Sequence, residues 1–153
     1  MAVEVGDVAP DFTLRDQDNQ KVSLSSLRGR NVVLVFYPMD FSPVCTGELK
    51  EISATRERYH AAGAEVFGIS IDSRYVHAAF RRDEQLEVTL LADFHPKGRV
   101  ASEYGAYLDG AGFATRATFV IDKDGVVRHK VVGTVPEARD PEEYLEALAG
   151  FPL

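Results

Sequence analysis

The chain has 153 residues, of which 45% are hydrophobic and 27% charged, with one cysteine and a net charge of −7. This length suits one domain with its own core, so we expect residues 1–153 to fold as a single domain. The acidic balance disfavours binding to nucleic acid or to an anionic membrane. A lone cysteine excludes an intramolecular disulfide and a multi-cysteine metal site.

The beginning of the sequence carries no recognisable targeting signal. Residues 1–7 lack the basic segment and the apolar segment of a signal peptide. The apolar runs along the chain are far shorter than the roughly 20 residues that a transmembrane helix needs. These patterns predict a cytoplasmic location.

The first part of the chain predicts a hairpin and two central strands. Residues 12–15 and 21–24 alternate on either side of the turn-forming run 16–20, which predicts an N-terminal β-hairpin. The continuous apolar run 32–37 is typical of a strand covered on both faces. A second run of this kind, 65–71, predicts another central strand.

Helical patterns follow both central strands. The first predicted helix runs from about Ser42 to Ala62. Either Asp72 or Ser73 is expected to cap the second, because both are preferred N-cap types. Its spacing predicts that Val76 and Phe80 share one buried face.

The second half predicts more strands and ends in a helix. Residues 90–92 predict a short strand, and 117–122 and 126–132 predict a hairpin joined by the turn 123–125. The last helix is the best marked, and its signals are a cap at Asp140, a first residue at Pro141, a reciprocal partner at Glu143, and a buried stripe of Tyr144, Leu145 and Leu148. This order of elements predicts an α/β fold: a thioredoxin-like three-layer sandwich with a central mixed β-sheet and an N-terminal β-hairpin.

The segment 37–49 is the most informative for function. It directly follows a predicted central strand, and sites in α/β sheets form beyond the carboxyl ends of strands. Ser42 is a preferred N-cap type and Pro43 suits the first helical position, so Cys45 falls at the third. Free backbone N–H groups and the helix dipole at that position favour thiolate over thiol. The alternative is a cysteine that serves only as a small buried apolar side chain.

The pattern Pro38-x-x-x-Ser42-x-x-Cys45 resembles the active-site signature of the peroxiredoxins, Pro-x-x-x-(Thr/Ser)-x-x-Cys. The likeness extends in order through 9–12, 29–38, 116–122 and 124–125. We therefore identify the chain as a member of this family, the AhpC/TSA superfamily. It is most similar to the one-cysteine alkyl hydroperoxide reductase E type.

The resemblance implies a thiol peroxidase that reduces hydrogen peroxide and organic hydroperoxides. Cys45 would be the nucleophile and would become a sulfenic acid. Ser42 would hydrogen-bond the substrate oxygens, and Pro38 would shield the sulfenate from water. Arg116 would orient the thiolate and polarise the peroxide.

Ionisation of the thiol alone does not account for fast peroxide reduction. An ordinary thiol is already a few per cent thiolate at neutral pH, so the remaining acceleration must come from stabilising charge on the leaving oxygen. Arg116, Ser42 and the backbone N–H groups near Val44 are the candidates. Glu48 would bridge to Arg116 and hold it in place; alternatively, it only complements the helix dipole.

Without a second cysteine, the resemblance implies recycling by an external thiol. This reductant would be a low-molecular-weight thiol with a glutaredoxin-like protein, or a thioredoxin. A homodimer is expected from the loop aromatics Phe41, Phe94 and Phe113. No cofactor and no metal is predicted, since His60 and His77 lie among polar helix residues and are expected at the solvated surface. His95 is placed in a loop near the active site.

Two other functions share the same sequence features. The thiol would serve as a switch in a peroxide sensor or holdase, which sustained turnover with a thiol reductant would distinguish from a peroxidase. A non-catalytic thioredoxin-like binding domain with an inert Cys45 is the other alternative. The hydroxyl of Ser42 and the guanidinium of Arg116 argue against it, because inert packing requires neither group.

Overall fold

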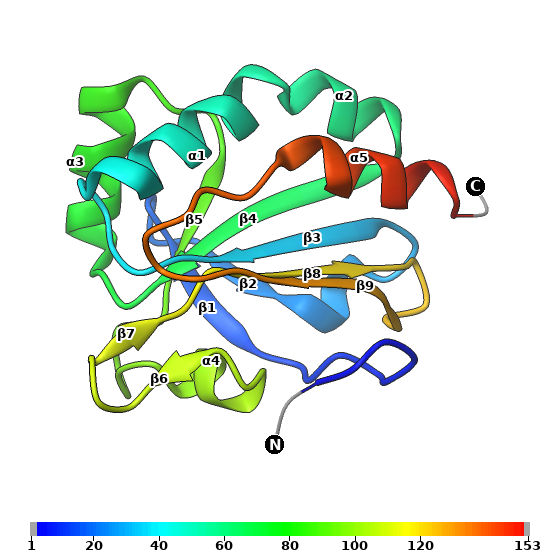
Figure 1. Cartoon of the computed structure of the whole chain (residues 1–153), viewed down its shortest axis with the longest axis horizontal. Helices are drawn as coiled ribbons and strands as arrows, with labels where there is room; N and C mark the ends of the chain where they lie inside the picture. The colour runs from blue at the N-terminus through cyan, green and yellow to red at the C-terminus, as the bar shows by residue number, and fades with distance from the viewer. Residues whose placement is uncertain (1–2, 152–153) are drawn as a thin grey trace.

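The computed structural model describes residues 3–151 and is built on a mixed sheet of seven strands (Figure 1). The strand order is β2-β1-β5-β4-β3-β8-β9, in which β4 pairs in parallel with β3 and β5 while the other pairs are antiparallel. The strands are β1 (Thr13–Asp16), β2 (Lys21–Ser23), β3 (Asn31–Phe36), β4 (Ala64–Ser70), β5 (Thr89–Ala92), β8 (Ala117–Ile121) and β9 (Val127–Val132). The mixed sheet and the N-terminal hairpin are therefore confirmed.

Helices cover both faces of this sheet. They are the short 3₁₀ helix η1 (Leu24–Leu27) and the helices α1 (Pro43–Ala54), α2 (Arg56–Ala61), α3 (Arg74–Glu84), α4 (Arg99–Glu103) and α5 (Pro141–Ala149). Figure 1 shows α1, α2 and α5 on one side of the sheet, and α4 on the other. Within residues 3–151, no helix is long and apolar enough to span a membrane.

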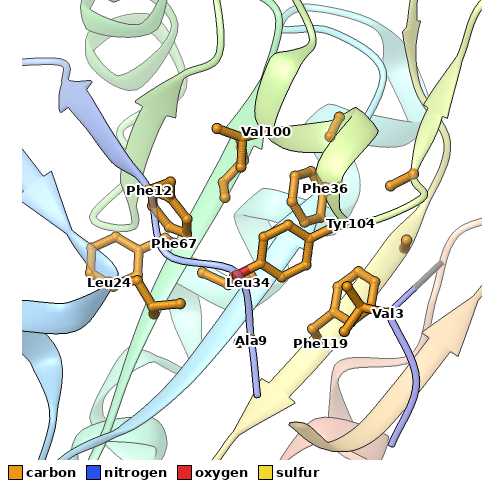
Figure 2. Close-up of a cluster of buried hydrophobic side chains, with 14 of the residues drawn as sticks. Val3, Ala9, Phe12, Leu24, Leu34, Phe36, Phe67, Val100, Tyr104 and Phe119 are labelled. Carbon is orange, nitrogen blue, oxygen red and sulfur yellow. The ribbon is translucent and has the colours of Figure 1, made fainter. Parts of the chain in front are cut away.

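Alternating side chains of β3 divide the core into two halves. Leu34 and Phe36 point to the face of α4, where they join Tyr104 and Phe119 (Figure 2). Val33 and Val35 point to the face of α1, α3 and α5. A sheet packed on both faces accounts for the continuous apolar run of this strand. The predicted three-layer thioredoxin-like sandwich is confirmed.

The predicted helix from Ser42 to Ala62 is wrong in one respect, because it is two helices. The backbone of Thr55 leaves the helical region at φ −104° and ψ 13°. Its hydroxyl donates to the carbonyl of Glu51 at 3.0 Å, four residues earlier. Such a bond from threonine competes with the backbone ladder and bends helices.

Helix α3 corrects two further predictions. Its cap is Ser73, which accepts a hydrogen bond from the N–H of Val76 at 3.2 Å. Val76 was predicted on the buried face but is 37% exposed, and the buried face consists of His77 and Phe80. His77 was predicted at the solvated surface, and it is fully buried. Polar neighbours in sequence are a poor guide here, because they occupy the other side of the helix.

The end of the chain follows its helix signals with one difference. Asp140 caps α5 by accepting from the N–H of Glu142 at 3.0 Å, and Pro141 is the first helical residue. Glu143 does not return a bond to the cap, since its carboxylate pairs with His129 at 2.8 Å. A small hairpin that was not predicted, β6 (Tyr107–Leu108) with β7 (Phe113–Ala114), lies between α4 and β8.

Candidate active site

Cys45 lies in the first turn of α1, just beyond the carboxyl end of β3. Pro43 is the first helical residue, and the first helical hydrogen bond runs from the N–H of Thr46 to the carbonyl of Ser42 at 2.9 Å. The N–H groups of Val44 and Cys45 precede this bond, so they are available to an anion at the helix start. The Cys45 side chain is fully buried on the face of the core that contains α1 and α5.

Ser42 occupies the N-cap position but does not cap the helix with its side chain. Its hydroxyl donates instead to the carbonyl of Met39 at 3.0 Å, within the same loop. The hydroxyl of Thr46 turns back to the Ser42 carbonyl at 2.8 Å. Since its own proton is engaged, the Ser42 oxygen offers lone pairs to a donor beside it.

Two other residues singled out in the sequence, Pro38 and Val44, belong to the same segment as Cys45. Pro38 is buried two residues after the end of β3, and Val44 is half-buried in the first turn of α1. The loop after β3 and the first turn of α1 therefore place Pro38, Ser42, Val44 and Cys45 beyond the carboxyl end of β3.

Glu48 lies one helical turn after Cys45, on the same side of α1. Its Oε1 accepts a hydrogen bond from Nη1 of Arg116 at 2.6 Å, and both side chains are almost fully buried. Arg116 stands immediately before β8, and its Nε donates to the carbonyl of Val135 at 2.5 Å. The guanidinium is thus fixed from two sides.

A second arginine, Arg139, joins the same carboxylate and was not found in the sequence. Its Nε donates to Oε2 of Glu48 at 2.9 Å, its Nη2 to Oε1 at 3.0 Å, and its backbone N–H to Oε2. Its Nη1 donates to the hydroxyl of Thr118 at 3.0 Å. In the sequence, Arg139 is marked only by its position directly before Asp140, the cap of α5. That position does not indicate that α5 begins beside α1.

The Glu48, Arg116 and Arg139 side chains form a buried cluster with two positive charges and one negative charge. Burial by itself would raise the pKa of the Glu48 carboxyl, yet hydrogen bonds and charge from Arg139, together with the charge of Arg116, hold that pKa below its ordinary value. Glu48 is therefore ionised at neutral pH. The excess positive charge favours an anion at the neighbouring helix start.

A thioredoxin-like sandwich with a buried thiol at a helix start and a guanidinium cluster one turn away is the arrangement of a peroxiredoxin. The AhpC/TSA family matches residues 5–130. Alkyl hydroperoxide reductase E of Mycobacterium tuberculosis is 37% identical over 150 residues, which cover 97% of this chain and 98% of that protein.

Solved structures agree with this family. AhpC of Enterococcus faecalis has a TM-score of 0.89 at 27% identity and covers 97% of this chain and 92% of its own. Peroxidoxin BcpB of Mycobacterium tuberculosis has a TM-score of 0.85 at 30% identity and covers 99% of both chains. The chain belongs to the AhpC/TSA family, and it is an oxidoreductase of the peroxiredoxin class.

Proposed function

We propose that the chain is a one-cysteine peroxidase in which the Cys45 thiolate attacks the terminal oxygen of a hydroperoxide. A sulfur–oxygen bond forms while the oxygen–oxygen bond breaks, and the electron pair of that bond stays with the leaving oxygen. The leaving oxygen takes a proton and departs as water or an alcohol. The sulfur, oxidised by two electrons, becomes a sulfenic acid.

The observation that carries this proposal is the buried cluster of Glu48, Arg116 and Arg139, one turn after the only cysteine. Two guanidinium groups held in place by one carboxylate provide positive charge that does not have to reorganise during the reaction. Arg116 uses Nε and Nη1 in bonds to the protein. Its Nη2 is the nitrogen that we assign to the peroxide oxygens.

Ser42 and the helix start complete the assignment. Because the Ser42 hydroxyl donates to Met39, its lone pairs suit the O–H of a hydroperoxide. The N–H groups of Val44 and Cys45 suit the negative charge on the sulfur and the attacked oxygen. Buried Pro38 restricts the access of water to the sulfenic acid.

Recycling requires a thiol from outside the chain, since Cys45 is its only cysteine. An external thiolate attacks the sulfenic sulfur, water leaves, and a mixed disulfide remains. A second thiol then releases the Cys45 thiol and carries away the disulfide. A low-molecular-weight thiol with a glutaredoxin-like protein, or a thioredoxin, serves as the reductant in this scheme, and the relative named for alkyl hydroperoxides suggests that organic peroxides are substrates.

Stopped-flow mixing of reduced protein with one equivalent of hydrogen peroxide tests the first step. We expect rapid loss of one equivalent of peroxide, one sulfenic-acid adduct by intact mass, and neither result in Cys45→Ser. A reaction no faster than that of a free thiol would reject the proposal. Sustained turnover with added thiol would separate a peroxidase from a sensor that reacts once.

We also propose that the chain acts as a single domain that pairs with a second copy through exposed aromatics of the active-site end. Phe41 is 48% exposed and Phe94 is 57% exposed, whereas Phe113 is half-buried in β7 rather than in a loop. Sedimentation should show a dimer that Phe94→Ser weakens. A parent chain that is monomeric at every concentration would rule out this pairing.

The cytoplasmic location stays a prediction.

A further inference from the structure

We propose that His77 is a positioning residue for peroxide reduction, acting through Asp40 to hold the active-site loop 38–42 in its reactive shape. The inference rests on the proposed function. His77 lies on α3, outside the segment that carries Pro38, Ser42 and Cys45. Among the described residues, His77 is the one histidine that hydrogen-bonds to this loop.

The contact between His77 and Asp40 is short and lies in the protein interior. Nδ1 of the ring lies 2.6 Å from Oδ2 of Asp40, and both side chains are fully buried. Nε2 lies 3.0 Å from the carbonyl of Leu91 on β5. A carbonyl only accepts, so Nε2 carries a proton, and a second proton is held between Nδ1 and the carboxyl group.

Asp40 is held on its other sides as well. Its Oδ1 accepts a hydrogen bond from the hydroxyl of Tyr37 at 2.5 Å. Its backbone N–H donates to Oδ2 of Asp72 at 2.8 Å, and Ser70 donates to the same oxygen. Asp40, Asp72 and His77 place ligand-type atoms within 4.8 Å of one another, as in a metal site. These hydrogen bonds already engage those groups, which favours a closed polar network over a cation site.

Phe41, the residue after Asp40, also packs against α3. The ring of Phe41 packs on Phe80 of α3 with centroids 5.0 Å apart, and Phe80 is one turn after His77. Phe41 has φ of +69°, a left-handed conformation that is unfavourable for a bulky side chain. Neighbouring contacts must maintain such a conformation. The contact of Phe41 with Phe80 and the bond of Asp40 to His77 both come from one face of α3.

These contacts with α3 matter for the reaction because the loop carries two of the groups that we propose take part in peroxide reduction. Pro38 lies two residues before Asp40 and Ser42 two residues after it. Loss of the His77 contact removes one of the bonds that hold Asp40, allows Phe41 to relax, and moves the Ser42 hydroxyl relative to the Cys45 sulfur. Small displacements of reacting groups lower rates steeply.

Two amide variants divide the two bonds of His77 between them. In His77→Asn, the side-chain N–H replaces Nδ1 and keeps the bond to Asp40; in His77→Gln, it replaces Nε2 and keeps only the bond to Leu91. Each variant is mixed with one equivalent of hydrogen peroxide, and alkylation of Cys45 by iodoacetamide is measured in parallel. His60→Gln on α2, outside the site, is the matched control.

We expect His77→Gln to lower the second-order rate constant with peroxide about 10- to 100-fold. His77→Asn should restore most of this rate, and alkylation should be at least as fast in both variants, because a looser loop exposes the sulfur. A purely structural role predicts equal losses in the two variants, since each keeps one bond. Equal losses, or peroxide rates within about twofold of the parent in both, would overturn the inference.

Two further outcomes are also decisive. Should His77→Gln fail to fold, Asp40→Ala breaks the same bond from the loop, and an unchanged peroxide rate in that variant would overturn the inference. An inert parent would instead reject the proposed function, and the inference with it. A reactive parent with indifferent variants would reject the inference alone.

Discussion

The Arg139 guanidinium donates to both carboxylate oxygens of Glu48, a residue 91 positions earlier in the chain. Arg116 donates to one of the same oxygens. A single carboxylate thereby joins α1, the start of β8 and the loop before α5. The position of the proposed peroxide-binding guanidinium depends on an acid that does not itself take part in the reaction.

Replacing Glu48 with glutamine should cost both stability and activity. The amide keeps the shape of the side chain but leaves two guanidinium groups buried without a counter-charge. Breaking a buried ion pair in this way costs about 3–5 kcal/mol in the free energy of unfolding. Urea unfolding measures this loss, and stopped-flow mixing measures the slower reaction with peroxide.

The matched control for that variant is Glu51→Gln, which removes an exposed acid from the same helix. We expect it to change the free energy of unfolding by less than about 0.5 kcal/mol. A Glu48→Gln chain as stable as this control would mean that the cluster does not depend on the carboxylate charge.

The same carboxylate should make the fold sensitive to acid. Arg139 and Arg116 hold the pKa of Glu48 below its ordinary 4.5, so the unfolded chain binds this proton more tightly than the folded chain. The stability that Glu48 contributes is therefore complete above about pH 4.5 and is lost as the pH falls through the folded pKa. Asp72 and Asp93 act in the opposite sense, because burial raises their pKa and their contribution declines as the pH rises above 3.8.

Urea unfolding between about pH 6 and pH 3 separates these contributions. The free energy of unfolding of the parent should fall more steeply on acidification than that of Glu48→Gln, which has no titrating group at this position. Parallel curves would show that other carboxyl groups govern the acid sensitivity.

Arg116→Lys should separate the peroxide reaction from general thiol reactivity. Lysine keeps the charge but cannot bond Val135, Glu48 and a peroxide with one planar fork. We expect the rate constant with hydrogen peroxide to fall about 10²- to 10³-fold, the loss typical of removing one donor to a developing oxyanion. Alkylation of Cys45 by iodoacetamide should fall much less, since no oxygen leaves in that reaction. Equal losses in both reactions would remove Arg116 from the bond-breaking step.

Much of the fold was predictable because its signals are local. The apolar run of β3, the Lys123–Gly125 turn and the cap of α5 each lie within a few residues. The break at Thr55 was not predictable, because the helical pattern continues through it. The buried state of His77 was missed for a related reason: its partners, Asp40 and Leu91, come from two distant segments.

The site divides along the same line. The helix start that holds Cys45 follows from adjacent residues, Ser42 and Pro43. Arg139 has no local motif, and its role in the cluster depends on α5 packing beside α1 on the same face of the sheet. The Ser42 hydroxyl was expected to hydrogen-bond the substrate oxygens, a role that stays a prediction; its donation to the carbonyl of Met39 within the loop was not anticipated.

Gly68 on β4 offers a last test, of how tightly the core supports the loop. A Cβ added there would lie 2.8 Å from Leu90, 3.1 Å from Tyr37 and 3.3 Å from Leu49, all of them buried. Gly68→Ala should lower the free energy of unfolding by about 1–3 kcal/mol, as overpacking does. Because Tyr37 bonds Asp40, the variant should also slow peroxide reduction.

Gly47→Ala is the matched control for Gly68→Ala, because a Cβ at that exposed position in α1 meets no neighbour within 4 Å. Alanine in a helix interior is favoured over glycine, so this control should gain about 0.5–1 kcal/mol in the free energy of unfolding. Urea unfolding measures both variants, and the opposite signs distinguish crowding from backbone propensity. A Gly68→Ala chain that gains stability would show that Leu90 and Tyr37 move aside freely, and the loop would then be less firmly supported than the packing of β4 implies.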